Sequence, residues 1–262
     1  MNDFKQRFGG IGRLLSDKGL DRLKNSHVCV IGVGGVGSWA VEALARSGIG
    51  AITLIDLDDV CVTNINRQLP ALDGQIGRPK IDVLADRIAL INPDCTVTAE
   101  HKFFTTSNAD DILSRPFSYI IDAFDNAKLK ATLIAGCRDR DIPIITAGGA
   151  GGLSDPCAIQ VADLRDVNND SLLAQLRKRL RQKHAFPRGK NKLRVPAVFS
   201  TERPVYPTGD GEVCANREDG SDDLKLNCES GFGTATYVTG AFGFAITGHV
   251  VNELAHSEAK GT

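Results

Sequence analysis

The feature that most constrains the fold is a glycine turn between an apolar run at residues 27–31 and a helical run at residues 38–47. The turn contains the glycines Gly32, Gly34, Gly35 and Gly37. Glycines in this pattern allow a tight turn and a close backbone approach to a phosphate, and the new helix directs unpaired N–H groups and its positive dipole end at the anion. A strand, a glycine turn and a helix in this order predict a phosphate-binding unit.

A second predicted strand ends in an acidic residue. Residues 51–55 are apolar, and Asp56 follows them. An acid about 20 residues after such a glycine turn binds a nucleotide ribose in dinucleotide-binding folds. The pair of strands therefore predicts a nucleotide site, and the turn alone does not decide which nucleotide.

Strand-like and helical segments alternate along the first half of the chain and beyond. Buried strands at 118–121 and 142–146 flank a helix at 127–140, and the pattern changes at Cys157. This alternation predicts an α/β fold with a doubly wound, mostly parallel, Rossmann-like sheet and a C-terminal elaboration. We expect residues 1–155 to form the nucleotide-binding domain and residues 156–262 to form a substrate-binding elaboration of the same globular unit.

Composition narrows the class of protein. The chain has 262 residues, a formal net charge of −1 and seven cysteines, none of them in a C-x-x-C pair. Reduced thiols in a cytoplasmic protein without zinc are therefore expected. The most apolar late segment, 237–251, is interrupted by Gly240, Gly243 and Gly248, so it predicts a buried, glycine-packed helix and no membrane span.

The segment after the second strand is unusually long and polar. Residues 57–77 carry Asp58, Asn64 and Arg67 before Lys80, which lies in the first turn of the next helix. Loops of this length inside a compact domain are uncommon and usually functional. Arg67 and Lys80 are cations in segments that can fold back over the glycine turn, where they would hold anionic phosphates.

Another acid follows the strand that ends at Asp122. The carboxyl ends of parallel strands lie on the ligand edge of such a sheet, so Asp125 is placed to hold Mg²⁺. With Arg67 and Lys80, it favours a nucleoside triphosphate over a dinucleotide, because an NAD-dependent oxidoreductase has no need for these phosphate-binding cations.

Six motifs then occur in order: Arg7-Phe8, the glycine turn, Asp56-x-Asp58, Asn64-x-Asn66-Arg67-Gln68, Gly77-x-x-Lys80 and Asp122-x-x-Asp125-Asn126. This series resembles the adenylating domain of the ubiquitin-activating superfamily, which includes activators of ubiquitin-like proteins in the molybdopterin and thiamine pathways. The resemblance covers about residues 7–150. It implies ATP and Mg²⁺ as cofactors, conversion of a carboxylate into an acyl-adenylate, and a homodimer.

The resemblance also implies roles for individual residues. Arg67, Lys80 and Asp125 would be catalytic, with Mg²⁺ on Asp125. The nucleotide-binding residues would be Gly32, Gly34, Gly35, Gly37, Asp56, Asp58, Asn64, Arg67, Lys80, Asp122, Asp125 and Asn126. Arg7 and Arg13 are candidates for an arm that reaches a phosphate in the same or a neighbouring subunit, although they are also typical of a solvated helix.

Later segments are similar to one branch of this superfamily. Residues 146–152, 198–202 and 228–233 resemble the bacterial threonylcarbamoyladenosine dehydratases. That branch implies tRNA as partner and the ATP-dependent cyclisation of the threonylcarbamoyl group on the adenosine next to the anticodon. Two alternatives stay open: an adenylating activator of a small sulfur-carrier protein, which the missing C-x-x-C pairs weaken, and a nucleotide-binding partner of a sulfur-transfer protein.

Three further features have two interpretations each. Residues 177–192 are rich in lysine and arginine, which form either a solvated face or tRNA phosphate contacts. The candidate contacts are Arg177, Arg179, Arg181, Lys183, Arg188, Lys190 and Lys192. Cys228 is either a candidate acyl-accepting thiol or, like the cysteines at 29, 61, 95, 137 and 157, a packing residue. The glycine run 148–152 is either close packing or a backbone site for the substrate or a monovalent cation.

Overall fold

The computed structural model describes residues 3–208, 211–215 and 232–257. The elements, in chain order, are α1 (Asp3–Leu15), α2 (Asp17–Lys24), β1 (His27–Ile31), α3 (Gly35–Arg46), β2 (Ala51–Asp56), η1 (Val62–Asn64), α4 (Lys80–Ile91), β3 (Thr96–His101), α5 (Ala109–Leu113), β4 (Tyr119–Asp122), α6 (Ala127–Arg138), β5 (Ile144–Ala147), η2 (Pro156–Ala158), β6 (Ile159–Asp163), α7 (Ser171–Lys183), β7 (Pro196–Ser200), β8 (Tyr206–Pro207), β9 (Val213–Cys214) and α8 (Thr236–His256).

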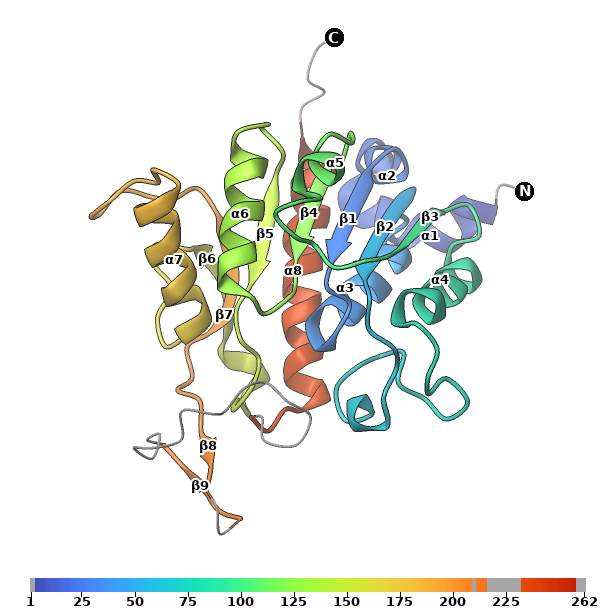
Figure 1. The fold of residues 1–262 in the computed structure, drawn as a ribbon. Helices are drawn as coiled ribbons and strands as arrows, with labels where there is room; N and C mark the ends of the chain where they lie inside the picture. The colour runs from blue at the N-terminus through green and yellow to red at the C-terminus, as the bar shows by residue number, and fades with distance from the viewer. Residues whose placement is uncertain (1–2, 209–210, 216–231, 258–262) are drawn as a thin grey trace.

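A seven-stranded sheet forms the centre of the molecule (Figure 1). Its strand order is β3-β2-β1-β4-β5-β7-β6. Neighbouring strands are parallel except for β6, which is antiparallel to β7. The order reverses on either side of β1, so the predicted doubly wound α/β fold is confirmed. Strands β6 and β7 extend the same sheet, because Ala197 of β7 pairs with Thr146 of β5.

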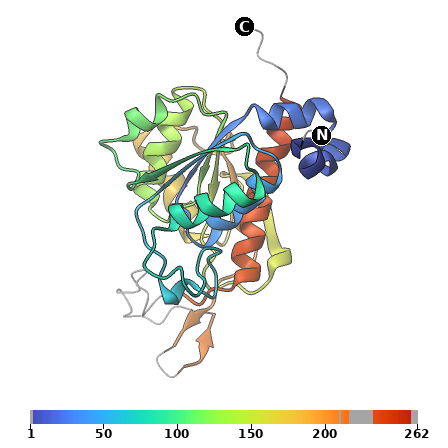
Figure 2. The ribbon, with the colours of Figure 1, turned by 90° about the vertical axis from the view of Figure 1, so that its right-hand side faces the viewer.

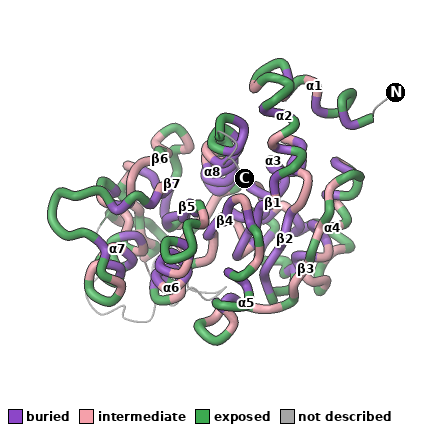
Figure 3. Tube along the Cα trace, turned by 90° about the horizontal axis from the view of Figure 1, so that it is seen from above, coloured by how far each residue is buried: buried purple, intermediate pink, exposed green. Residues whose placement is uncertain are grey.

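Helices cover both faces of this sheet. Seen from above, α2, α3 and α8 lie on one face and α5, α6 and α7 on the other (Figure 3). Two hydrophobic clusters correspond to these faces, one containing Leu44 of α3 and Phe242 of α8, the other Ile134 of α6 and Leu176 of α7. The apolar strands are therefore buried on both sides, as is usual for parallel sheets.

The C-terminal helix α8 packs against the N-terminal helix α2. Arg22 of α2 donates through an Nη atom to the Ala255 carbonyl at 2.6 Å, and Figure 2 shows α8 running from α1 and α2 to the opposite end of the molecule. A Cβ at Gly243 would lie 2.7 Å from Cβ of Trp39, so only glycine allows α8 to approach α3 so closely. The predicted glycine-packed helix is confirmed. Among the described residues, no helix is both long enough and apolar enough to cross a membrane.

Candidate functional site

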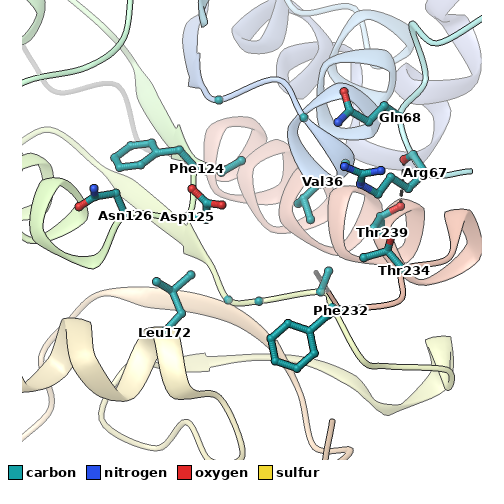
Figure 4. Close-up of a pocket in the computed structure, with 18 of the residues that line it drawn as sticks. Val36, Arg67, Gln68, Phe124, Asp125, Asn126, Leu172, Phe232, Thr234 and Thr239 are labelled. Carbon is teal, nitrogen blue, oxygen red and sulfur yellow. Dashed lines mark hydrogen bonds between the residues drawn. The ribbon is translucent and has the colours of Figure 1, made fainter. Parts of the chain in front are cut away.

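A large pocket opens at the carboxyl ends of β1, β2, β4 and β5 (Figure 4). Its volume is about 1610 Å³, and its lining comes from the glycine turn, the long loop after β2, the loops after β4 and β5, the start of α7 and residues 232–234. This edge is where open α/β sheets bind ligands. The pocket therefore brings together segments far apart in the sequence.

The glycine turn has the geometry expected of an anion site. Gly32 has a φ of +84°, and a Cβ at Gly37 would lie 1.9 Å from the Gly32 carbonyl oxygen. Gly34 is the N-cap of α3 and makes no side-chain cap bond, so the first N–H groups of the helix are available to an anion. Gly32, Gly34 and Gly35 line the pocket, whereas Gly37 acts by packing beneath the turn.

Asp56 holds the turn in place. Its Oδ2 accepts from the Val33 N–H at 2.7 Å and its Oδ1 from the Asp58 N–H at 2.9 Å. Asp56 is buried yet lines the pocket. Each carboxylate oxygen has a second lone pair, so the same side chain remains able to accept a ribose hydroxyl.

The long loop after β2 is fixed by its own polar side chains and by α8. The buried Asn64 accepts from the Cys61 N–H at 3.1 Å. Asn66 donates through Nδ2 to the Thr234 carbonyl at 2.8 Å, and the Arg67 carbonyl accepts from Trp39 Nε1 and Thr239 Oγ1, both at 3.1 Å. The Arg67 guanidinium lines the pocket and donates to the Thr63 carbonyl at 2.8 Å. Trp39 of α3 and Thr239 of α8 thus fix the backbone at Arg67 together.

Lys80 reaches the pocket from the first residue of α4. Its Nζ lies 2.8 Å from Oδ2 of Asp58, and the Lys80 side chain is 6% exposed against 53% for Asp58. The cation is thereby presented at the pocket with its long stem buried. Asp58 and Lys80 were predicted as separate site residues, and the structure shows that they form an ion pair.

The loop after β4 contributes one free acid. Asp125 is exposed, lines the pocket and makes no hydrogen bond or ion pair with the rest of the described chain. Asn126 also lines the pocket, but its Oδ1 caps α6 by accepting from the N–H groups of Lys128 and Leu129 at 3.0 and 3.1 Å. Asp125 therefore carries the available negative charge, and Asn126 fixes the loop that presents it.

Asp122 is not part of the pocket lining. It is fully buried, with Lys130 Nζ 2.9 Å from its Oδ1 and the Thr146 hydroxyl donating to its Oδ2 at 2.7 Å. Burial raises the pKa of this carboxyl, and the Lys130 ammonium opposes that effect. Lys130 also donates to the Ala147 carbonyl at 3.0 Å. The pair thus joins the ends of β4 and β5, from which the Asp125 loop and the Gly148 loop start.

Several pocket residues had no role predicted from the sequence, although Gln68 stands in the motif that begins at Asn64. Gln68 is buried, and its Oε1 has no hydrogen-bond partner among the described atoms. Phe124 stacks on Phe104 with ring centroids 6.1 Å apart, and Phe232 lies on the wall formed by the C-terminal part (Figure 4). Gln68 follows Arg67 directly, which was the available signal; the aromatic residues have no periodicity that separates them from core residues.

The burial of the cysteines differs in part from the prediction made from the sequence. Cys61 and Cys157 are exposed, so their assignment as packing residues was wrong, and Cys61 lines the pocket. A hydrogen bond from the Thr63 hydroxyl lowers the pKa of the Cys61 thiol. Cys29 and Cys137 are buried as expected, and burial raises the pKa of both thiols. Cys228 lies outside the described residues.

The candidate arm lies away from the pocket of its own chain. Arg7 pairs with Asp3 at 2.7 Å and donates to the carbonyl of Ile91, the last residue of α4 before β3. This is the amino edge of the sheet, opposite the ligand edge. Arg13 is exposed on the same helix, α1. A role of either arginine at a neighbouring subunit's phosphate stays a prediction.

The basic segment contains two kinds of cation. Arg177 donates to the carbonyls of Leu164 and Val167, and Arg181 to those of Pro187 and Gly189, so these two organise the adjoining loops. The exposed members are without an acidic partner in the part of the chain that the structure describes; they are Lys178, Arg179, Lys183, Arg188, Lys190 and Lys192. The latter group forms a surface with uncompensated positive charge.

The glycine run after β5 is closely packed. A Cβ at Gly148 would lie 2.0 Å from Oδ2 of Asp170, and one at Gly151 would lie 2.7 Å from Cβ of Phe232. Asp170, the N-cap of α7, accepts from the Gly149 N–H at 2.9 Å. Close packing accounts for Gly148 and Gly151. The structure describes no group of three or more His, Cys, Asp or Glu side chains arranged for a metal, and a monovalent cation at this run stays a prediction.

Comparison with known proteins identifies the protein family. The ThiF family matches residues 10–252. This chain belongs to the ThiF family. A relative in Haemophilus influenzae, tRNA threonylcarbamoyladenosine dehydratase, is 50% identical over 97% of this chain and 95% of its own length.

Solved structures of a tRNA N6-threonylcarbamoyladenosine dehydratase have the same fold as this chain. The Escherichia coli tRNA N6-threonylcarbamoyladenosine dehydratase, solved in complex with ATP, is 47% identical, with a TM-score of 0.86 over 97% of this chain and 96% of its own. The same protein has also been solved in complex with AMP, with a TM-score of 0.85. By contrast, the Escherichia coli sulfur carrier protein ThiS adenylyltransferase is 36% identical, and its match spans only 53% of this chain.

Proposed function

We propose that this protein is an ATP-dependent tRNA threonylcarbamoyladenosine dehydratase. It binds ATP at the glycine turn, transfers AMP to the carboxylate of the threonylcarbamoyl side chain on a tRNA adenosine, and closes that side chain into a ring with loss of water and release of AMP. The observation that carries the proposal is the end-to-end likeness to dehydratases, which includes the C-terminal part that shapes the pocket.

The chemistry of activation matches the groups in the pocket. A carboxylate is a poor electrophile because oxide is a prohibitive leaving group, so the substrate carboxylate attacks the α-phosphorus of ATP and pyrophosphate departs. Arg67 and Lys80 neutralise negative charge on the phosphates as it shifts toward pyrophosphate, in a site already arranged to receive it. The acyl-adenylate that forms carries AMP as its leaving group. In the ring-closing step AMP departs far more readily than oxide would.

Ring closure needs no covalent enzyme intermediate. The carbamoyl oxygen of the same side chain attacks the activated carbonyl carbon, the bond to AMP breaks, and the carbamoyl group loses a proton. Because the nucleophile is tethered to the electrophile, the reaction proceeds at high effective molarity. The protein's contribution to this step is to hold the side chain in place and keep competing water away from the acyl-adenylate.

The pocket suits Mg²⁺ bound together with a nucleotide. Mg²⁺ at phosphate-transfer sites is usually held by one or two carboxylates plus the phosphates themselves, rather than by an all-protein cage. Asp125, exposed and free of partners, fits that role. The ion, when bound, would supply positive charge to the phosphates.

The direct test is to incubate the purified protein with ATP, Mg²⁺ and tRNA carrying threonylcarbamoyladenosine, and to digest the tRNA for mass spectrometry. The expected result is loss of one water from the modified nucleoside with one AMP formed per turnover. A parallel reaction offers a small sulfur-carrier protein with a free C-terminal carboxylate. An unchanged nucleoside together with an adenylated carrier protein would contradict the proposal and favour the carrier-activating alternative.

A further inference from the structure

The pocket is larger than one small ligand needs. Ligand pockets typically enclose about 300–1,000 Å³, whereas this one encloses about 1610 Å³. Part of its lining is the nucleotide machinery described above. The remainder comes from the loop after β5, the start of α7 and the segments around residues 204–206 and 232–234. We call this remainder the second compartment, and its apolar lining includes Leu172, Pro204, Tyr206 and Phe232.

Strand order separates the second compartment from the nucleoside of ATP. In this fold the phosphates lie at the glycine turn after β1, and the ribose lies at the acid that ends β2, here Asp56. The sheet order β3-β2-β1-β4-β5 then places the nucleoside on the β2 side of the phosphates and the second compartment on the β5 side. Figure 4 agrees, since Leu172 and Phe232 lie across the pocket from Gln68 and Arg67.

The Phe232 ring is held by the chain around it. The Gly152 N–H donates to the Gly233 carbonyl at 2.8 Å, and the Val205 N–H donates to the Gly152 carbonyl at 2.8 Å, so three segments are tied together. The Tyr206 ring packs against the Phe232 ring with centroids 5.1 Å apart at 50°. Gly151 lacks the Cβ that would crowd Phe232. Phe232 and Tyr206 therefore form a fixed aromatic pair at the pocket wall.

We propose that Phe232, supported by Tyr206, stacks on the adenine of the tRNA nucleoside whose carboxylate is adenylated. The inference rests on the proposed function. Proteins that recognise unpaired RNA bases stack them on aromatic side chains, and an enzyme that modifies a base must hold it outside the helical stack. A base on Phe232 would lie on the β5 side of the ATP phosphates, from which its side-chain carboxylate could be directed at the α-phosphate.

The basic surface supports this occupant. Leu172 in the first turn of α7 lines the second compartment, and Arg179 is seven residues further along the same helix. At about 1.5 Å per residue, the exposed cations begin roughly 10 Å from the compartment. The phosphates that flank a tRNA nucleotide in the compartment would thus lie within reach of uncompensated positive charge. A free small molecule has no such flanking phosphates and would not need this charge.

The test compares Phe232→Ala, Phe232→Trp and wild type in the full chain, by steady-state kinetics with threonylcarbamoylated tRNA and by calorimetric titration with ATP. Loss of one stacked base raises KM for tRNA in Phe232→Ala roughly five- to 150-fold, while the Kd of ATP stays at the wild-type value, which also shows that the variant is folded. Phe232→Trp, which keeps a stacking surface, retains a KM close to wild type. Phe244→Ala is the matched control, because Phe244 is 53% exposed on α8 outside the pocket lining.

Each other outcome overturns the inference. An unchanged tRNA KM in Phe232→Ala shows that the base does not stack there, and a parallel rise in the Kd of ATP assigns the aromatic pair to the nucleotide instead. Failure of Phe232→Trp to rescue a weakened Phe232→Ala shows a packing role only. If wild-type protein leaves the nucleoside unchanged, the proposed function is contradicted and the stacking inference fails with it. If wild-type protein is active, the variants test the stacking inference alone.

Discussion

Asp125 and Asp59 are exposed carboxylates of the pocket without partners in the described ranges, whereas Asp56, Asp58 and Asp170 are bound to N–H groups or to Lys80. The difference between the first two is position. Asp125 follows β4, beside the strand that leads into the glycine turn, and Asp59 follows β2 on the other side. We expect the β4 loop to hold a phosphate-bound cation, so Asp125 is the candidate ligand and Asp59 the comparison.

Replacing Asp125 with Asn keeps the size and hydrogen-bonding capacity of the side chain but removes its charge. We expect AMP formation to fall at least about a hundredfold, the usual scale for losing one preorganised electrostatic contact at a reacting centre. Asp59→Asn, the matched control, is expected to retain activity within about threefold. Rates of ATP–pyrophosphate exchange measure the effect; equal rates in the two variants would show that the charge at 125 has no special role.

Single residues were only partly predictable from the sequence. Gly32, Lys80 and Asp125 could be placed because each follows or precedes a strand or helix with a clear apolar pattern. The partners of Asp122 and Asn66 could not, because Lys130, Thr146 and Thr234 have no sequence signal that they meet those residues. Likewise, the exposed thiol of Cys61 follows from the shape of a loop, which no periodicity describes.

One buried carboxylate joins two helices beside the site. Glu42 of α3 is buried and pairs with Arg87 of α4 at 2.6 Å and with Arg46 at 2.7 Å. Burial alone would raise the pKa of the Glu42 carboxyl, but hydrogen bonds from Arg87 and Arg46 outweigh it and lower the pKa below its ordinary value of 4.5. The link steadies α4, whose first residue is Lys80.

This lowered pKa predicts a pH dependence of stability. A carboxyl whose pKa is lower in the folded state contributes stability that is fully present above the unfolded value and is lost as pH falls through the folded value. The free energy of unfolding of wild type should therefore decline below about pH 4.5 more steeply than that of Glu42→Gln. Urea denaturation between pH 3 and pH 7 measures both; parallel curves would contradict the ion-paired state of Glu42.

Across the whole molecule, the C-terminal part completes the wall of the pocket. Strands β6 and β7 extend the sheet, α8 packs on α3, and Thr234 and Thr239 bind the loop that carries Arg67. The alternation of strands and helices predicted the sheet because burial on both faces leaves a strong apolar signal. The closing of the pocket by residues 204–206 and 232–234 was not predictable, because it depends on contacts between segments remote in the sequence.

The basic surface of α7 and its loop predicts salt-dependent tRNA binding. We expect the double substitution Arg179→Glu and Lys190→Glu, at exposed cations with no acidic partner, to raise KM for tRNA and leave KM for ATP unchanged. Each lost phosphate contact should reduce the slope of log K against log salt by about 1. Arg177 is unsuitable for this test because it supports the backbone. An unchanged slope would assign the surface to solvation.

Transfer of AMP to the tRNA side-chain carboxylate is the activating step of the proposed reaction. It is tested most directly with substrate tRNA whose threonylcarbamoyl carboxylate carries ¹⁸O. Attack of that carboxylate on the α-phosphorus and ring closure leave one labelled oxygen on the phosphate of AMP, which mass spectrometry of the released nucleotide detects. Labelled AMP with unlabelled pyrophosphate is the predicted result. Label in inorganic phosphate with formation of ADP, or in water alone, would contradict AMP transfer to the carboxylate.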